Sequence, residues 1–275
     1  MRILITGANG QLGHDLADVL AGEALHPFDH AALNIADRTA VDETVSRIKP
    51  DWIVNAAAFN DVDGAEKNES TAFAANADGP EHLAAAAARV GARLIHVSTD
   101  YVFDGRKGSP YNENDAPNPL SVYARSKREG ERRVLASGAP ACVLRTAWLY
   151  GRHGKNFVKA IQGAAARGVP LKVVADQVGS PTSTADLAAA AAALMRTPAA
   201  GLYHVVNAGA CSRFEFARAI VGDQVEVLPI TTAEAARPAP RPQNSALTSV
   251  RWASTGLPPL RSWEAALEAY LHAPA

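Results

Sequence analysis

The sequence predicts an α/β fold, a Rossmann-type doubly wound parallel sheet followed by a smaller C-terminal substrate-binding lobe. Short, nearly continuous apolar runs alternate with helical patterns along the first 150 residues, and the first run ends in a glycine-rich turn. Strands that are buried on both faces give such continuous apolar runs, and helices then cover both faces of the sheet. The length of 275 residues suits one large domain or two modest ones.

The first half supplies five expected strands, each an apolar run of four to seven residues that ends in small or polar residues. They are residues 3–6, 24–28, 52–57, 94–99 and 143–149. The run at 24–28 is the weakest because it contains two polar or ring-constrained positions, His26 and Pro27. Longer patterns between the runs predict helices over residues 11–20, 39–48, 70–90 and 122–136. Gly79 and Pro80 interrupt the third helix, where proline removes a backbone donor, so we expect a kink or break there.

The pattern loosens after about residue 150. We expect helices at 156–166, 185–195, 214–221 and 263–271, strands at 171–174 and 203–207, and an extended or looped proline-rich stretch at 236–242. We therefore expect a dinucleotide-binding domain over residues 1–150 and a smaller lobe over residues 151–275, with parts of the lobe packing back on the first domain. The cleft between them is the expected place for substrate.

The charge and hydropathy of the chain limit the kinds of molecule that it is expected to bind. The formal net charge of −1 and the pI of about 6.7 give no general attraction to nucleic acid or to an anionic membrane. The N-terminal run is too short for a signal peptide, and no apolar stretch is long enough to span a membrane. Cys142 and Cys211 lack metal-like spacing, and Cys142 is expected to be a buried, inert thiol. A cytoplasmic protein is expected, and a homodimer stays open.

The glycines of the first turn predict a dinucleotide site. Gly7, Gly10 and Gly13 follow a strand and open a helix, with the spacing G-x-x-G-x-x-G. Small residues let the backbone approach a pyrophosphate, and the helix N-terminus offers free N–H groups. Asp29, 22 residues after Gly7, stands where such folds often place an acid that binds the adenosine ribose, which favours NADH. Nearby His26, His30 and Arg38 leave the choice between NADH and NADPH open.

Tyr123 and Lys127 form the expected catalytic pair. Lying four residues apart on one helix, they share a face, and an ammonium near a phenol lowers the phenol's pKa. Lysine can also hold the nicotinamide ribose. Thr99, at the carboxyl end of the fourth expected strand, can donate its hydroxyl to a reacting carbonyl oxygen. Arg241 and Arg251 are candidate phosphate ligands, because guanidinium groups suit pyrophosphate.

These motifs together resemble the extended short-chain dehydrogenase/reductase superfamily, and within it the dTDP-4-dehydrorhamnose reductases. The matching stretches are residues 6–13 (TGANGQLG), 55–63 (NAAAFNDVD), 98–105 (STDYVFDG), 123–131 (YARSKREGE), 145–151 (RTAWLYG), 176–182 (DQVGSPT) and 241–247 (RPQNSAL). The likeness spans nearly the whole chain, and the stretch at 98–105 is its most specific part.

The resemblance implies that the C4 ketone of dTDP-4-dehydro-L-rhamnose is reduced to give dTDP-L-rhamnose, with NADPH or NADH as cofactor. It implies that Tyr123 is the proton donor, that Lys127 tunes Tyr123 and holds the ribose, and that Thr99 acts beside them. It also assigns a sugar site to Thr99, Asp100 and Trp148. The implied cofactor-binding residues are Gly7, Gly10, Gln11, Leu12, Gly13, Asp29, Asn34, Ile35, Ala57, Ala58, Phe59, Tyr123 and Lys127.

Two features depart from the pattern that the resemblance implies. The adenine side often carries Asp before an aliphatic residue, whereas this chain has Asn34 before Ile35. Some relatives hold Mg²⁺ with acids at a dimer contact, and Asp15 is the candidate equivalent. The sequence offers no convincing ligand cluster for Mg²⁺, so no catalytic metal is expected.

Rival functions remain at this stage. A 4-epimerase or another reductase of the superfamily would share the same motifs, whereas a 4,6-dehydratase is disfavoured because Tyr101 stands where those enzymes have a glutamate. A second rival is a non-catalytic NADP-binding subunit like the regulatory subunit of methionine adenosyltransferase. The presence of Thr99, Tyr123 and Lys127 together favours an enzyme.

Overall fold

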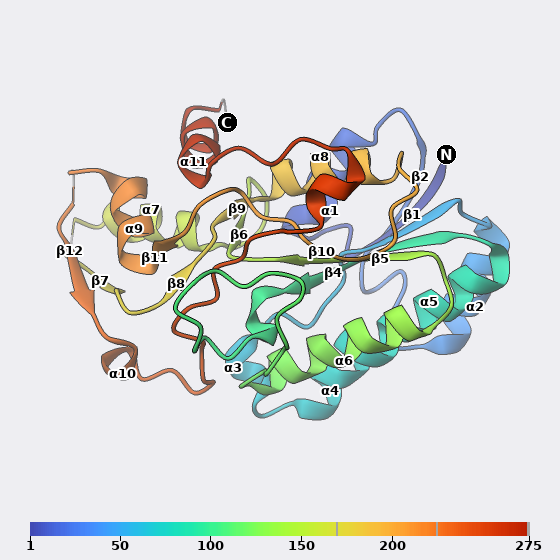
Figure 1. Cartoon of the computed structure of the whole chain (residues 1–275), viewed down its shortest axis with the longest axis horizontal. Helices are drawn as coiled ribbons and strands as arrows, with labels where there is room; N and C mark the ends of the chain where they lie inside the picture. Colours follow the sequence, from blue (N-terminus) through green and yellow to red (C-terminus); the bar gives the residue numbers. More distant parts are fainter. Residues whose placement is uncertain (169, 224, 274–275) are drawn as a thin grey trace.

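The computed structural model describes residues 1–168, 170–223 and 225–273 (Figure 1). Its largest layer is a parallel sheet of six strands in the order β10-β5-β4-β3-β1-β2. The strands are β1 (Arg2–Thr6), β2 (Ala24–Phe28), β3 (Trp52–Asn55), β4 (Arg93–Thr99), β5 (Ala141–Thr146) and β10 (Gly201–His204). The predicted doubly wound fold class is confirmed, because β1 pairs with β2 on one side and with β3 on the other. This reversal of strand order opens a crevice at the carboxyl ends of β1 and β3.

Alternate side chains of the strands feed two cores, one on each face of the sheet. Ile3 and Ile5 of β1 point into one cluster, and Leu4 points into the other. The first face is covered by α1 (Gln11–Val19) and α8 (Thr184–Leu194), which pack on each other. The second face is covered by α2 (Arg38–Ile48), α5 (Gly79–Val90) and α6 (Val122–Ala136), as Figure 1 shows.

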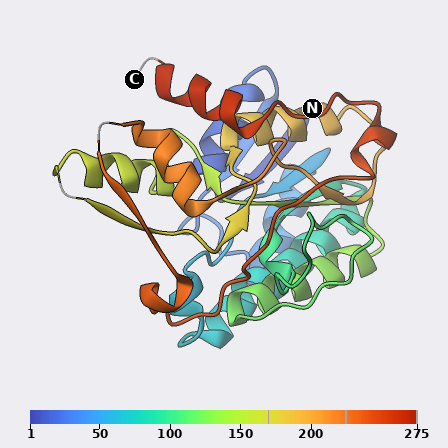
Figure 2. The ribbon, with the colours of Figure 1, turned by 60° about the vertical axis from the view of Figure 1, so that its left-hand side comes forward.

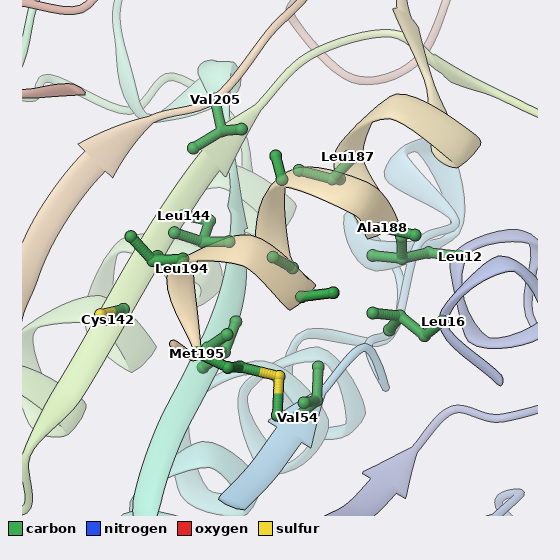
Figure 3. Close-up of a cluster of buried hydrophobic side chains, with 14 of the residues drawn as sticks. Leu12, Leu16, Val54, Cys142, Leu144, Leu187, Ala188, Leu194, Met195 and Val205 are labelled. Carbon is green, nitrogen blue, oxygen red and sulfur yellow. The ribbon is translucent and has the colours of Figure 1, made fainter. Parts of the chain in front are cut away.

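Figure 3 shows the first core, where Leu12 and Leu16 of α1 meet Leu187 and Ala188 of α8 above the sheet. The alanines of α8 let it lie close to α1 and the strands. Cys142 belongs to this core and is fully buried, as expected, and burial raises the pKa of its thiol to about 11.

The smaller part of the molecule carries short strand pairs. They are β7 (Leu171–Val174) with β12 (Val227–Ile230), β8 (Val178–Gly179) with β11 (Cys211–Ser212), and β6 (Leu149–Tyr150) with β9 (Thr182–Ser183). Helices α7 (Phe157–Ala165), α9 (Arg213–Val221) and α11 (Trp263–His272) surround an aromatic core built on Tyr150, Phe216 and Trp263. Figure 2 shows these helices gathered beside the main sheet, with the short α10 (Thr232–Ala235) at one end of the group.

Three expected elements differ from the structure. The strand predicted over residues 203–207 lies earlier, at Gly201–His204 (β10). The strand predicted over residues 143–149 is divided into β5 and β6, because Trp148 has a φ of +46°, which no extended strand accommodates. The helix predicted over residues 70–90 consists of α4 (Glu69–Phe73), a π-helical turn (Ala74–Asp78) and α5. The expected break therefore takes the form of a widened turn immediately before Pro80.

The side chain of Asn76 joins the widened turn to the loop after β3 and to α6. Asn76 accepts from the Phe59 amide at 2.8 Å and donates to the Phe59 carbonyl at 3.1 Å, so the side chain completes the hydrogen bonds of the loop after β3. It also donates to Ser126 of α6 at 3.0 Å. The short α3 (Val62–Ala65) follows that loop. Among the described residues, no helix combines the length and the apolar character that crossing a membrane requires.

Candidate active site

The glycine turn fits the approach of a dinucleotide. Gly7 has a φ of +71°, and a Cβ atom there would lie 2.6 Å from the Ala57 backbone nitrogen. A Cβ atom at Gly13 would lie 2.3 Å from the carbonyl oxygen of Gly7. Gly10 is the N-cap of α1 and has no side chain to cap the helix, so the first amides of α1 face outward. A free helix N-terminus beside bare backbone is suited to a pyrophosphate.

A cavity of about 260 Å³ lies over this turn. Its lining joins the glycine turn, the ends of β3, β4 and β5, and one face of α6. The lining residues are Gly7, Gly10, Gln11, Leu12, Gly13, Ala56, Ala58, Asn60, Val97, Ser98, Thr99, Asp100, Tyr123, Lys127, Thr146, Ala147, Trp148 and Leu149. All three catalytic candidates and all three sugar-site candidates therefore share one cavity.

Helix α6 presents the catalytic pair. Ser121 caps its N-terminus by accepting from the Ala124 amide, which fixes the register of the first turn. Tyr123 and Lys127 follow one turn apart and are both buried. The Lys127 ammonium donates to the carbonyl oxygen of Val97, on the neighbouring strand β4, at 2.6 Å. The Tyr123 ring meets Tyr101 edge-on, with ring centroids 6.1 Å apart.

The electrostatics of the pair differ from the expectation that Lys127 lowers the phenol's pKa. Burial raises the pKa of Tyr123 above its ordinary value, with the Thr99 side chain acting in the opposite direction. Burial also lowers the pKa of Lys127 to about 8, with Glu131 acting in the opposite direction. Desolvation dominates both groups because each is enclosed by protein. Tyr123 is consequently a protonated phenol at neutral pH, the form that an acid needs.

Asp100 lies directly after Thr99 and is almost fully buried. The Thr99 hydroxyl donates to one carboxylate oxygen at 3.0 Å, and the Ser245 hydroxyl donates to the other. Burial raises the pKa of Asp100 to about 6, while these two hydroxyls and Arg213 act to lower it. The strand-end hydroxyl of Thr99 is therefore tied to a carboxyl group within the same cavity.

Trp148 stands between this cavity and a second one. Among the described residues, Trp148 and Leu149 alone line both. The second cavity has a volume of about 900 Å³ and an apolar side formed by Phe157, Ile161 and Val173. Its charged lining residues are Lys155, Lys172, Arg213, Arg237 and Arg241. None of its described lining residues is acidic, so the electrostatic field in this cavity favours an anion.

Arg241 is held in that lining by a forked ion pair. Its two terminal nitrogens donate to the two oxygens of Asp63 at 2.9 and 3.0 Å. The Ala239 amide donates to the same carboxylate at 3.0 Å. Of the two arginines that the sequence suggests for phosphate, Arg241 lines the cavity. Arg251 instead lies at the start of a short 3₁₀ turn (Trp252–Thr255) and is not among the described residues that line either cavity.

The candidates for the adenosine side lie outside the first cavity. Asp29 accepts from the Asn9 side chain at 2.8 Å and from the Ala32 amide at 2.9 Å, so its carboxylate is fixed beside the glycine turn. Asn34 is exposed, and its side chain accepts from the Ala36 amide. Ile35 is buried in the core against α5.

The candidates after β3 are divided. Ala58 lines the first cavity, whereas the Ala57 amide donates to the Asn55 side chain at 3.1 Å and Phe59 packs in a small cluster with Tyr123. Sequence reasoning missed further lining residues of the first cavity: Ala56, Asn60, Val97, Ser98, Thr146, Ala147 and Leu149. Most of them follow from the rule that ligand-contacting groups gather at the carboxyl ends of parallel strands.

Asp15, the candidate equivalent of a Mg²⁺ ligand in relatives, lies near Asp18 and His153, with ligand atoms within 4.8 Å of one another. The sequence did not single out Asp18 or His153. None of the three is among the described residues that line the catalytic cavity. Acidic groups at a surface often gather without an ion, and we assign this cluster no chemical role.

The chain matches the family model described as "RmlD substrate binding domain" over residues 1–274. It is 48% identical over 286 residues to a dTDP-4-dehydrorhamnose reductase of Mycobacterium tuberculosis, a match that covers 100% of this chain and 93% of that protein. A structure of dTDP-4-dehydrorhamnose reductase from Bacillus anthracis in complex with NADP superposes with a TM-score of 0.95 at 40% identity, covering 98% of each chain. A structure from Clostridium acetobutylicum with the same name superposes with a TM-score of 0.96 at 42% identity, again over 98% of each chain. The chain therefore belongs to the RmlD family, the dTDP-4-dehydrorhamnose reductases of the extended short-chain dehydrogenase/reductase superfamily.

Proposed function

We propose that this protein reduces the C4 ketone of dTDP-4-dehydro-L-rhamnose, giving dTDP-L-rhamnose at the expense of NADPH or NADH. One observation carries the proposal. A buried Tyr123, with Lys127 and Thr99 beside it, lies in a cavity over a glycine turn, and Trp148 joins this cavity to a larger basic one. The first cavity suits the nicotinamide end of a cofactor, and the second suits the nucleoside diphosphate of a nucleotide sugar.

The cofactor, when bound, supplies the hydride. Gly10, Gln11 and Leu12 hold its pyrophosphate at the N-terminus of α1, where backbone amides face the cavity. Gly7 and Gly13 keep that approach free of side chains. Asp29, Asn34 and Ile35 surround the adenosine, and Ala57, Ala58 and Phe59 flank the middle of the molecule. Lys127 holds the nicotinamide ribose.

Tyr123 donates the proton that the new C4 hydroxyl requires. Its pKa is raised by burial, so the phenol remains protonated until the substrate oxygen gains negative charge. When substrate binds, the Thr99 hydroxyl turns its proton from Asp100 to the same oxygen and positions it. The Lys127 ammonium then stabilises the phenolate that proton transfer leaves behind.

The substrate's nucleotide end occupies the larger cavity. A pyrophosphate carries two negative charges, and Arg241, whose two terminal nitrogens are held by Asp63, lines this cavity together with Lys155, Lys172, Arg213 and Arg237. Asp100 contacts the sugar hydroxyls, and Trp148 packs against the sugar ring. This arrangement places the hexose at the junction of the two cavities, next to Tyr123.

The choice between NADH and NADPH follows from the carboxylate beside the glycine turn. Asp29 is fixed by Asn9 and by the Ala32 amide, so its carboxylate lies beside the glycine turn. A fixed carboxylate accepts from a ribose 2′-hydroxyl and repels a 2′-phosphate. We therefore propose NADPH or NADH as the cofactor, with the carboxylate of Asp29 favouring NADH.

We also propose that residues 1–150 serve mainly the cofactor and that residues 151–275 serve mainly the substrate. The separate aromatic core of the smaller lobe supports this division, with α8 and β10 packing back on the main sheet. A nucleotide sugar is the proposed partner and the cytoplasm the proposed location. A homodimer is left to experiment.

The decisive experiment supplies purified protein with dTDP-4-dehydro-6-deoxy-glucose and a 3,5-epimerase, and follows the loss of NADH and NADPH separately. Stoichiometric oxidation of the cofactor with formation of dTDP-L-rhamnose is the expected result. Protein that contains tightly bound nicotinamide and leaves added cofactor unconsumed would instead indicate an epimerase. Absence of turnover together with stoichiometric binding of a partner enzyme would indicate a regulatory subunit.

A further inference from the structure

Trp148, which lines both cavities at their junction, has an unusual backbone conformation. Trp148 has a φ of +46°, a region that residues with a Cβ atom rarely occupy, especially bulky ones. Its backbone is anchored where β6 pairs with β9, Leu149 opposite Thr182. Strain of this kind persists only where surrounding contacts impose it, and it gathers at functional sites.

Gly179 supplies one of those contacts. A Cβ atom at this position would lie 2.3 Å from Cε2 of the Trp148 ring and 2.6 Å from Cζ2. The indole therefore rests directly on backbone of β8, and an alanine has no room unless the ring moves. The antiparallel pairing of Gly179 with Cys211 fixes this backbone relative to the start of α9.

Arg213 supplies the other contact. Its guanidinium carbon lies 3.5 Å from the centroid of the Trp148 ring, a stacking distance. Arg213 is the first residue of α9, directly after the N-cap Ser212. A cation at this end of a helix is opposed by the helix dipole, and burial lowers the pKa of the guanidinium. Because both effects make this position unfavourable for a cation, we infer that the stacking of Arg213 on Trp148 serves the function of the site.

We propose that Gly179 and Arg213 are positioning residues for Trp148, and that the ring they fix sets the place of the hexose relative to Tyr123. The inference rests on the proposed function, since it concerns the binding of a nucleotide-linked 4-ketohexose at the junction of the cavities. Gly179 contributes by having no side chain. Arg213 contributes by the planar shape of its guanidinium group, which stacks on the indole.

Gly179→Ala tests the first contact. The Michaelis constant for dTDP-4-dehydro-L-rhamnose should rise about tenfold or more, with the constant for NADPH changed by less than about twofold. Gly163→Ala is the matched control, because a Cβ atom on that exposed position of α7 meets nothing within 4 Å. Equal Michaelis constants for dTDP-4-dehydro-L-rhamnose in Gly179→Ala and Gly163→Ala would overturn the proposal.

Arg213→Lys tests the second contact, because lysine keeps the charge and loses the planar fork. If Arg213 positions the ring, Arg213→Lys should raise the sugar constant as Arg213→Ala does. Full rescue by lysine would show that only the charge matters and would overturn the role in positioning.

A double-substitution cycle shows whether both residues act through the ring. In a Trp148→Ala background, Gly179→Ala and Arg213→Lys should each change the sugar constant little further. Independent, additive losses would contradict the proposal. Because the chain has three other tryptophans, the emission of Trp148 is obtained by subtracting the spectrum of each protein's Trp148→Phe counterpart. This emission should change in both variants, since each alters a contact of the ring.

The two proposals fail in different ways. If the unaltered protein does not reduce dTDP-4-dehydro-L-rhamnose, the proposed function fails, while the fluorescence measurement still decides whether the two residues fix the ring. If the unaltered protein is active and the emission of Trp148 is the same in all variants, only the positioning inference fails. Should Gly179→Ala not fold, Arg213→Lys and its fluorescence decide the question.

Discussion

Tyr123 shows how burial can suit a residue to an acid's task. The phenol is enclosed by protein, and this burial raises its pKa instead of lowering it. In the direction of reduction the enzyme needs a proton held ready, and a raised pKa holds it. The ammonium of Lys127 is then required only when charge moves onto the phenol oxygen.

Replacing Tyr123 by phenylalanine should remove the proton and little else. We expect the turnover number to fall by roughly 10² or more, with the dissociation constant for NADPH almost unchanged. Single-turnover kinetics and a cofactor titration by fluorescence give the two quantities. A near-normal turnover number would refute the role of Tyr123 as the acid.

Asp100 should make the stability of the protein depend on pH. Its pKa is 3.8 in the unfolded reference and about 6 in the fold, so the folded state binds more protons between these values. Stability is highest below the lower pKa and is lost as pH rises through about 6. Relative to Asp100→Asn, the unaltered protein should lose about 2 kcal/mol of unfolding free energy between pH 4 and pH 7.

Urea unfolding of both proteins at the two pH values measures that loss, and the comparison cancels the groups that they share. A difference in unfolding free energy that does not change with pH would mean that Asp100 does not titrate in this range.

The sequence predicts single residues where their partners are close along the chain. Tyr123 and Lys127 are recognised from four-residue spacing, and Thr99 from its place at a strand end. Ser245 was not recognised, because its contact with Asp100 spans 145 residues and has no local signal. The same holds for Arg213, whose stacking on Trp148 is a product of the fold.

At the scale of elements, the turn from β1 to α1 depends on glycine at two points where backbone meets backbone. Gly7 faces Ala57, and Gly13 faces the carbonyl groups of Gly7 and Ala8. These neighbours are main-chain atoms and cannot swing aside as the end of a flexible side chain does. A side chain at Gly7 or Gly13 would therefore force the backbone of the turn itself to move.

Gly13→Ala should therefore disrupt cofactor binding more than it disrupts the fold. The added methyl group must push α1 away from the turn, so we expect the dissociation constant for NADPH to rise by roughly tenfold or more. Gly22→Ala, in the turn after α1, is the control because its Cβ atom meets nothing within 4 Å. Equal affinities in a calorimetric titration would count against the turn as the phosphate site.

Elements with a strong local pattern are predicted to within a residue or two. The helix expected at 122–136 and the strand expected at 171–174 coincide with α6 and β7. The π-helical turn before α5 was not predictable, because Asn76 bonds to the backbone of Phe59, 17 residues away. The division of β5 from β6 likewise depends on the surroundings of Trp148.

At the scale of the whole molecule, the proline-rich segment at 236–242 ties the smaller lobe to the first half of the chain. Asp63 receives both terminal nitrogens of Arg241 and the amide of Ala239, contacts that span more than 170 residues. The sequence predicts that this stretch is extended or looped, and the structure shows a loop with a turn at Ala236 and bends at Pro238 and Ala239. Its place beside α3 and over the larger cavity was not readable, because no local pattern encodes it.

Asp63→Asn should loosen that tie. The loss of a partly exposed ion pair worth about 0.5–1 kcal/mol should raise the Michaelis constant for the nucleotide sugar roughly two- to fivefold, with the constant for NADPH unchanged. Asp42→Asn, which breaks a surface pair with Arg89, serves as the control. Equal behaviour of the two variants in steady-state assays would argue against a role for Arg241 in binding substrate.

The contact between Asp100 and Ser245 also has a consequence for biosynthesis. While the ribosome is still adding the last fifth of the chain, the tyrosine, the lysine and the glycine turn already exist, yet the carboxyl of Asp100 lacks its second hydroxyl partner. Strand β10 and the loop that carries Arg241 also arrive late. The surroundings of Asp100 are therefore completed only after Ser245 has been added to the chain.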